Sequence, residues 1–203
     1  QNMGNLDLYN FVDNHDVERI YTKLSNKAHF TPVHILLYTL PGVPSIYYGS
    51  EFGIEGRKER SSDDSLRPAL SLDDYETALG DNPCTALIAA LGQIRQHTPA
   101  LSYGSYAELH LTNRQFAFAR DLNDVRVVVT VNNDDNAASM DLPAGNAVEY
   151  IGALSGQNQA MEHLGEPVGH RGDCFCVLSA AYVNIASGAV IEYRNCRCRR
   201  HGG

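Results

Sequence analysis

Four polar residues, Asp13-Asn14-His15-Asp16, follow directly on an apolar-rich run that begins at Leu6. A hydrogen-bond donor and an acceptor fixed side by side can bind the hydroxyl groups of a ligand, and they favour a transition state in which those hydrogen bonds strengthen. Two simpler roles stay open. Short polar residues also cap and turn a chain, and Asp13 with His15 would suit a metal only if a third ligand followed. The sequence shows no such ligand, so we expect no metal site.

A second group that could do chemistry is Asp63 and Arg67, which lie four residues apart in the long polar loop Ser50–Leu72. The planar fork of an arginine suits vicinal hydroxyls and a neighbouring carboxylate. The alternative is a solvated ion pair, which contributes little to stability. Three aromatic residues near the start of this loop offer ring faces for a sugar, although we expect them in the core: Tyr47, Tyr48 and Phe52.

A strand, a helix and a second strand are the elements that must position these residues. Leu6–Val12 predicts a buried strand whose carboxyl end opens into the site. A helix over His34–Leu40 follows, with Pro32 suited to the first helical position. Ser45–Tyr48 predicts the second strand. This order fits a right-handed β-α-β unit with parallel strands.

The pattern changes from helical to strand periodicity near residue 104. Asn82-Pro83 predicts a helix start, and the helix that ends at Thr98 has one apolar face, formed by Cys84, Leu87, Ile88, Leu91 and Ile94. Short strands without intervening helices then predict an antiparallel sandwich; they are Ala107–Leu111, Phe116–Arg120, Val125–Val131, Ala147–Ile151 and Cys174–Leu178. We expect domains over residues 1–103 and 104–180. In the remainder, 181–203, the segment Tyr182–Tyr193 is compatible with a hairpin around Ser187-Gly188. The basic, cysteine-bearing end after it is typical of a disordered or non-native tail, and a functional metal or nucleic-acid tail is the alternative.

Two segments, Phe11–Asp16 (FVDNHD) and Pro41–Glu51 (PGVPSIYYGSE), form a specific signal by their order and spacing. They resemble the fourth conserved region and the last barrel strand of the α-amylase superfamily, glycoside hydrolase family 13. Glu51–Gly56 continues in the manner of its cyclomaltodextrinase, neopullulanase and α-glucosidase branches. The resemblance implies an α/β plus all-β fold, in which the C-terminal portion of a (β/α)8 TIM barrel precedes a small antiparallel β-sandwich domain.

The resemblance also implies roles for individual residues. Asp16 would be the transition-state-stabilising carboxylate that grips the hydroxyls on carbons 2 and 3 of the sugar being cleaved. His15 would donate a hydrogen bond to the same sugar, and Asp63 and Arg67 would bind the next sugar outward. The implied substrate is an α-glucan or oligosaccharide, namely a maltodextrin, starch or a cyclodextrin.

In this family the nucleophilic aspartate and the acid glutamate belong to earlier barrel strands, upstream of the motif that opens this chain. A retaining mechanism needs both groups, so we expect the isolated chain to be inactive and to form the back part of a hydrolase. Two parallel strands leave an unpaired edge and an uncovered apolar face, so we expect association with a missing N-terminal catalytic half, or self-association. The alternatives are a non-catalytic carbohydrate-binding or interaction module with an amylase-like fold, and a structural fragment without autonomous function.

The net charge of −8 and the pI near 5.4 argue against nucleic acid or an anionic membrane as partner, since both would repel the chain. The longest apolar stretch, Val33–Tyr48, is broken by prolines and is shorter than the roughly 20 residues of a membrane span. No signal peptide is visible. Five cysteines in two C-x-C pairs plus one favour reduced thiols and a cytoplasmic compartment. We expect no cofactor in this chain and leave calcium open for the intact enzyme.

Overall fold

The computed structural model describes residues 7–134 without a gap and then shorter stretches, which are 138, 140–143, 149–154, 158–160, 177–179 and 189–192. The chain divides into two compact units, residues 1–102 and 103–203. Four of the five cysteines lie outside the described residues, and the fifth, Cys84, is a buried free thiol.

The first unit contains the predicted strand, helix and parallel strand, but the first strand is shorter than predicted and is not buried, since Tyr9 and Phe11 are 68 % and 47 % exposed. Strand β1 (Tyr9–Phe11) pairs in parallel with β2 (Val43–Ser45), in the register Tyr9↔Val43. β2 therefore begins two residues before the predicted strand and ends at its first residue. Pro44 is tolerated because alternate residues of a parallel strand point their N–H groups to the same side. Val43 N donates to Leu8 O over 2.7 Å, so the nitrogen of Pro44 faces away from β1.

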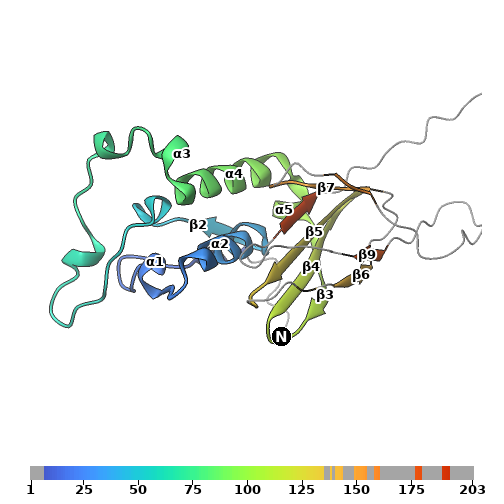
Figure 1. Ribbon diagram of the computed structural model, residues 1–203, viewed down its shortest axis with the longest axis horizontal. Helices are drawn as coiled ribbons and strands as arrows, with labels where there is room; N and C mark the ends of the chain where they lie inside the picture. The colour runs from blue at the N-terminus through green and yellow to red at the C-terminus, as the bar shows by residue number, and fades with distance from the viewer. Residues whose placement is uncertain are drawn as a thin grey trace, which may run out of the picture. The chain divides into compact units, whose positions relative to one another are not determined.

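Helix α2 (Phe30–Thr39) connects the two strands (Figure 1). A short helix, α1 (Ile20–Lys23), and a 3-10 turn, η1 (Lys27–His29), precede it. α2 begins earlier than predicted, so Pro32 is its third residue and not its first. The position still lies in the first turn, where an N–H would have no acceptor within the helix, so proline is accommodated there.

Helix α4 (Pro83–His97) begins as the sequence predicts and packs beside α2 (Figure 1). The side chain of Asn82 caps it, since its Oδ1 accepts from Cys84 N at 2.9 Å and from Thr85 N at 3.2 Å. From the last turn of α4, Arg95 donates to Tyr38 O at 2.5 Å and to Gly42 O at 2.6 Å. These bonds tie α4 to the carboxyl end of α2 and to the entry of β2.

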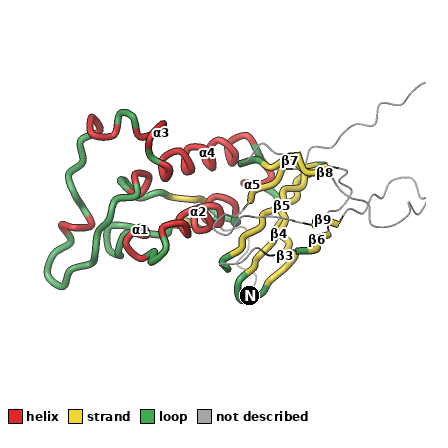
Figure 2. The backbone as a smooth tube through the Cα atoms, in the orientation of Figure 1, coloured by secondary structure: helices red, strands yellow, loops and turns green. Residues whose placement is uncertain are grey.

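Between β2 and α4 the chain is mostly loop (Figure 2). Three 3-10 turns interrupt it, η2 (Ser50–Phe52), η3 (Asp64–Leu66) and η4 (Leu72–Tyr75), and a short helix, α3 (Ala78–Asp81), leads into α4. The last helix, α5 (Pro99–Tyr103), spans the junction between the units. Within the described part of the chain, no helix combines the length and apolarity that crossing a bilayer requires.

The second unit is antiparallel, as predicted. One sheet has the strand order β3-β4-β5-β10-β7-β8, and a smaller one pairs β6 with β9. The strands are β3 (Ser105–Leu111), β4 (Gln115–Leu122), β5 (Val125–Asn132), β6 (Asp141–Pro143), β7 (Glu149–Gly152), β8 (Asn158–Ala160), β9 (Val177–Ser179) and β10 (Ala189–Glu192). β10 lies within the candidate hairpin Tyr182–Tyr193, and it pairs with both β5 and β7. The other residues of 181–203 lie outside the described residues.

Candidate active site

Asn14 forms the turn that follows β1. Its Oδ1 accepts hydrogen bonds from Asp16 N at 2.8 Å and from Val17 N at 3.1 Å. The turn-forming role that short polar residues commonly have thus falls to Asn14. The side chains of the next two residues stay accessible, at 53 % exposed for His15 and 60 % for Asp16.

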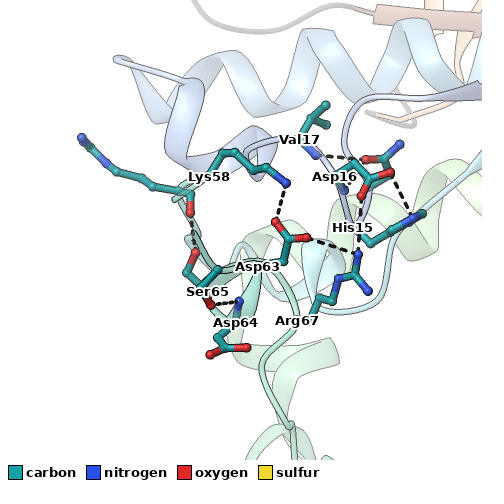
Figure 3. Close-up of polar contacts among 11 residues, drawn as sticks. His15, Asp16, Val17, Lys58, Asp63, Asp64, Ser65 and Arg67 are labelled. Carbon is teal, nitrogen blue, oxygen red and sulfur yellow. Dashed lines mark hydrogen bonds and ion pairs between the residues drawn. The ribbon is translucent and has the colours of Figure 1, made fainter. Parts of the chain in front are cut away.

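The four predicted site residues come together from two segments about fifty positions apart (Figure 3). His15 Nε2 lies 3.2 Å from Asp16 Oδ2. One guanidinium nitrogen of Arg67 lies 3.4 Å from Asp16 Oδ1 and 3.5 Å from Asp63 Oδ2. Arg67 is therefore shared between a carboxylate of the β1 loop and one of its own loop. This contact to Asp16 distinguishes the pair Asp63–Arg67 from an isolated surface ion pair.

Lys58 is a member of this cluster that the sequence did not single out. Its ammonium group pairs with Asp63 Oδ1 (Figure 3), which leaves Oδ2 to Arg67. The hydrogen bond from Lys58, together with the positive charges of Lys58, Arg67 and His15, lowers the pKa of Asp63 from its ordinary value. The Asp63 carboxylate is therefore ionised at neutral pH and available as an acceptor.

Asp13 lies on the inner side of the same turn and is 2 % exposed. Its carboxylate accepts from Ile20 N at 2.8 Å and from the hydroxyl of Ser50 at 2.8 Å and 3.0 Å. Ser50 comes directly after Gly49, at the end of the β2 segment. Asp13 thus joins the carboxyl ends of the two parallel strands and does not face a substrate.

Arg19 is fully buried and holds three segments together. Its guanidinium donates to Tyr48 O at 2.5 Å, to Ser50 Oγ at 3.1 Å and to Leu66 O at 2.8 Å, and its central carbon lies 4.3 Å from the centre of the Tyr47 ring. Through Ser50 the buried cation is linked to the Asp13 carboxylate. A buried charge needs such a partner, because its desolvation is costly. The two terminal nitrogens of Arg19 have acceptors, whereas its Nε is buried without a hydrogen-bond partner.

Arg19 forms hydrogen bonds to the two residues that flank the loop 57–65, Gly56 and Leu66. Arg19 N donates to Gly56 O at 3.0 Å, and the guanidinium donates to Leu66 O. The two ends of the loop touch at Gly56, where an added Cβ would lie 2.4 Å from Ser65 O. A side chain at this position would push the two ends apart, so glycine is required for the close approach.

The three aromatic residues predicted to be core differ in their surroundings. The prediction is wrong for Tyr48, which is 42 % exposed and whose hydroxyl donates to Pro68 O at 3.0 Å. Tyr47 is half-buried beneath Arg19. Phe52 is also half-buried, and its ring stacks on that of Tyr75 with the ring centres 3.8 Å apart. The ring of Tyr47 lies 6.4 Å from that of His15, so an aromatic face borders the candidate site.

His34 lies buried in α2, and its environment predicts a pH dependence. Its Nδ1 donates to Phe30 O at 2.8 Å. Burial lowers the pKa of His34 below its ordinary value of 6.5, although the Phe30 carbonyl and the Asp13 charge act in the opposite direction. Below pH 6.5 the unfolded chain takes up a proton at this histidine that the folded chain does not. The free energy of unfolding therefore decreases as the pH is lowered from 6.5 to the pKa of His34 in the folded chain.

We expect the urea concentration at the unfolding midpoint to decrease when the pH is lowered from 7.5 to 5.5. The decrease should be smaller in His34→Gln. His97→Gln is the matched control, since His97 makes the same Nδ1 contact to a carbonyl four residues earlier, Gln93 O at 2.8 Å, but is exposed. If both variants follow the pH dependence of the wild type, the burial of His34 is not its cause.

The described residues contain no group of three or more His, Cys, Asp or Glu side chains that could hold a metal ion. The cluster offers carboxylate acceptors on Asp16 and Asp63, and donors on His15, Lys58 and Arg67. Such a set suits a neutral ligand rich in hydroxyl groups, because it presents both kinds of partner at one exposed surface.

Comparison with known proteins gives a family and a fold. Residues 1–125 match the family model for the α-amylase catalytic domain. A cyclomaltodextrin glucanotransferase from Niallia circulans is 28 % identical over 159 residues, and one from Bacillus sp. (strain 38-2) is 30 % identical over 158 residues. Each alignment covers 75 % of this chain and 21 % of the relative. The chain thus spans about a fifth of the length of these relatives.

Solved structures show the same fold at low identity. The cyclomaltodextrin glucanotransferase CldA, with a three-domain ABC distribution, matches with a TM-score of 0.74 at 22 % identity, over 93 % of this chain and 37 % of its own. An Anoxybacillus α-amylase matches with a TM-score of 0.69 at 19 % identity, over 92 % and 38 %. These neighbours are α-amylase TIM-barrel proteins. The relatives named here are glucanotransferases, whereas the motif after Ser50 predicted the cyclomaltodextrinase, neopullulanase and α-glucosidase branches.

The matched region includes β1, α2, β2 and all four predicted site residues. It covers more than half of the chain, and the solved structures match nearly all of it. The chain belongs to the α-amylase family, glycoside hydrolase family 13.

Proposed function

We propose that this chain forms the C-terminal part of a retaining glycoside hydrolase that acts on α-glucosidic bonds in maltodextrin, starch or cyclodextrin-like substrates. One observation carries the proposal. His15 and Asp16 from the β1 loop, and Asp63 and Arg67 from the loop after β2, converge in one exposed cluster (Figure 3). Family membership supports it, because the cluster lies within the matched residues.

Asp16 and His15 would act on the sugar whose bond is cleaved. In an oxocarbenium-like transition state the ring hydroxyls become stronger donors, so a carboxylate fixed beside them binds the transition state more tightly than the ground state. Asp16 is held for this task by the turn at Asn14, and its two oxygens face His15 and Arg67. A sugar hydroxyl can replace either exposed contact at small cost, because exposed ion pairs contribute little.

Asp63 and Arg67 would bind the next sugar outward. Lys58 fixes one oxygen of Asp63, and Arg67 lies between the two carboxylates with its planar fork exposed. A guanidinium can donate two parallel hydrogen bonds to vicinal hydroxyls while a carboxylate accepts from a third. The outer subsite is therefore proposed to touch the inner one through Arg67.

The chemical step needs two further carboxyl groups. A retaining enzyme uses a nucleophile and a general acid about 5–5.5 Å apart on either side of the bond. Among the described residues, the carboxylates that gather at the site are Asp16 and Asp63, and Arg67 lies between them. We propose that other parts of the polypeptide supply the nucleophile and the acid, and that this chain alone does not turn over substrate.

An apolar surface on the first unit supports a partner for the barrel. Four side chains on or beside β1 and β2 are between 47 % and 68 % exposed, and they are Leu8, Tyr9, Phe11 and Val43. Exposed apolar side chains clustered on a short two-stranded sheet are typical of a surface that another element covers. We propose that the remaining barrel strands, the N-terminal catalytic half, cover it, and that self-association occurs in their absence.

The second unit is proposed to be the small β-sandwich of the resemblance. Its six-stranded antiparallel sheet would be one layer, and the β6–β9 pair, which approaches β3, would belong to the other. A second function, transglycosylation, is favoured by the relatives that bear the name cyclomaltodextrin glucanotransferase. The two reactions share the inner site and differ in whether water or a sugar hydroxyl accepts the glucosyl group.

The test is release of reducing sugar from maltotriose and a cyclodextrin by this chain alone, and by this chain joined to the proposed N-terminal catalytic half. We expect turnover only for the longer polypeptide, and product analysis separates hydrolysis from transfer. Turnover by the chain alone that disappears in Asp16→Asn would show that the nucleophile and acid lie within it. If neither form is active but maltotriose binds, the non-catalytic binding module replaces our proposal.

A further inference from the structure

The backbone is held on both sides of Arg67. Leu66 O accepts a hydrogen bond from the Arg19 guanidinium at 2.8 Å, and Pro68 O accepts one from the Tyr48 hydroxyl at 3.0 Å. The side chain of Arg67 makes long contacts, at 3.4 Å to Asp16 and 3.5 Å to Asp63, and it is half exposed. Exposed pairs of this kind contribute little and do not fix a long side chain. The position of Arg67 therefore depends on the bonds to its neighbours.

The two residues that hold these carbonyls are fixed to each other. The Arg19 guanidinium donates to the backbone carbonyl of Tyr48 at 2.5 Å and lies 5.2 Å from the centre of the Tyr48 ring. Arg19 is fully buried, so close packing restricts the conformations of its side chain. Tyr48 contacts the loop through the hydroxyl group of its partly exposed ring. Together they form one clamp with two contact points on the loop, at positions 66 and 68.

The clamp is also attached to the segment that carries His15 and Asp16. Arg19 lies three residues after Asp16, and it contacts Ser50, whose hydroxyl donates to Asp13 at 2.8 Å. The loop that carries Arg67 and the turn that carries Asp16 thus share one rigid support. A shared support keeps the guanidinium of Arg67 near Asp16 without a strong bond between them.

We propose that Arg19 and Tyr48 are positioning residues that hold Arg67 between Asp16 and Asp63, and so set the geometry of the outer sugar subsite. The part that concerns sugar rests on the proposed function; the part that concerns the loop does not. A loop fixed before binding loses less conformational freedom when the sugar binds. The clamp acts through main-chain carbonyls, so it leaves the side chain of Arg67 free to bind a ligand.

The first test uses Tyr48→Phe, which removes the bond to Pro68 O and keeps the ring beside Arg19. In the native loop Leu66 N donates to Asp63 O at 2.9 Å and Arg67 N donates to Asp63 O at 3.1 Å. We expect hydrogen exchange of these two amides, measured by NMR, to become about threefold to tenfold faster, as expected for the loss of one neutral hydrogen bond. Unchanged exchange would overturn the proposal.

Tyr9→Phe is the matched control. It removes a hydroxyl of the same kind, which lies 2.5 Å from Ser45 Oγ in the same unit but away from the loop. We expect it to leave exchange at Leu66 and Arg67 unchanged. If Tyr9→Phe accelerates the two amides as much as Tyr48→Phe does, the effect is a general loss of stability, and the clamp is refuted.

The second test measures maltotriose affinity in a double-mutant cycle with Arg67→Ala. We expect Tyr48→Phe to weaken binding about threefold to tenfold when Arg67 is present and not to weaken it further in Arg67→Ala. An equal loss in both backgrounds would show that Tyr48 does not act through Arg67. If the wild-type chain does not bind maltotriose, the sugar subsite fails, while the exchange measurement still decides whether the clamp exists.

Discussion

If this chain joined to the proposed N-terminal catalytic half is active, asparagine in place of Asp16 is expected to lower its kcat for maltotriose about 100- to 1,000-fold, a loss of about 2.7–4 kcal/mol of transition-state stabilisation. The amide keeps the size of the side chain and its place after the Asn14 turn. It lacks the negative charge that stabilises the positive charge of an oxocarbenium-like transition state. Substrate binding in the ground state depends on several other contacts, so KM should change much less than kcat. Steady-state kinetics from reducing-sugar release give both constants.

Asp64→Asn makes the same chemical change close by and serves as its control. Asp64 is exposed, and its contacts with neighbouring residues are made by its backbone, through Ser62 Oγ and the amide of Arg67. We expect the kinetics of this variant to match those of the wild type. If Asp16→Asn retains more than about a tenth of the wild-type kcat, the role proposed for Asp16 is wrong, because one lost preorganised contact should cost more.

Methionine in place of Arg19 is expected to lower the free energy of unfolding of the chain by about 3–5 kcal/mol, the usual cost of removing one member of a buried charged network. Three acceptors would lose their donor at once, namely Tyr48 O, Ser50 Oγ and Leu66 O. The Asp13 carboxylate would also lose its linked positive charge. Since domains are typically stable by about 5–15 kcal/mol, this is a large fraction of the total.

Urea denaturation followed by far-ultraviolet circular dichroism measures this effect, and the method suits a chain that has no tryptophan. Arg60→Met is the control, because Arg60 is an exposed arginine of the adjoining loop and should change stability by less than about 0.5 kcal/mol. Arg19→Lys should lie between the two, because an ammonium group keeps the charge but lacks the fork that reaches three acceptors. A loss below about 1 kcal/mol in Arg19→Met would mean that the buried network contributes little.

Local signals predicted the elements that carry the site, and their limits explain the differences. The cap at Asn82 and the periodicity of α4 are properties of adjacent residues, so the helix start agrees with the prediction. The predicted strand Ser45–Tyr48 follows the apolar and aromatic residues, whereas the observed β2 includes Pro44, which lies at a position that directs no N–H to β1. The central place of β10 in its sheet could not be predicted, since it depends on pairing with residues about sixty positions earlier.

The candidate site shows the same division. The sequence predicts Asp16 together with His15, and Arg67 together with Asp63, because the members of each pair are close in the chain. The 3.4 Å contact between Arg67 and Asp16 joins the two pairs and depends on the fold, so the sequence does not predict it. Arg19 could not be found in this way. Two of its three acceptors are main-chain carbonyls, at Tyr48 and Leu66, and the chemistry of a carbonyl does not depend on residue type. The burial of Asp13 is equally non-local, because its partner Ser50 lies 37 residues away.

The meeting of both ends of the loop 57–65 at Arg19 has a consequence for how substrate preference can change within such a scaffold. The intervening residues enter at Gly56 and leave at Leu66, and one side chain anchors both points. A graft of different length or composition between these anchors would alter which sugars are met outside the reaction centre, while the supports of Asp16 stayed where they are. Residues 57–65 can thus be replaced, by natural variation or by design, to change the proposed sugar specificity without changing the residues that support Asp16.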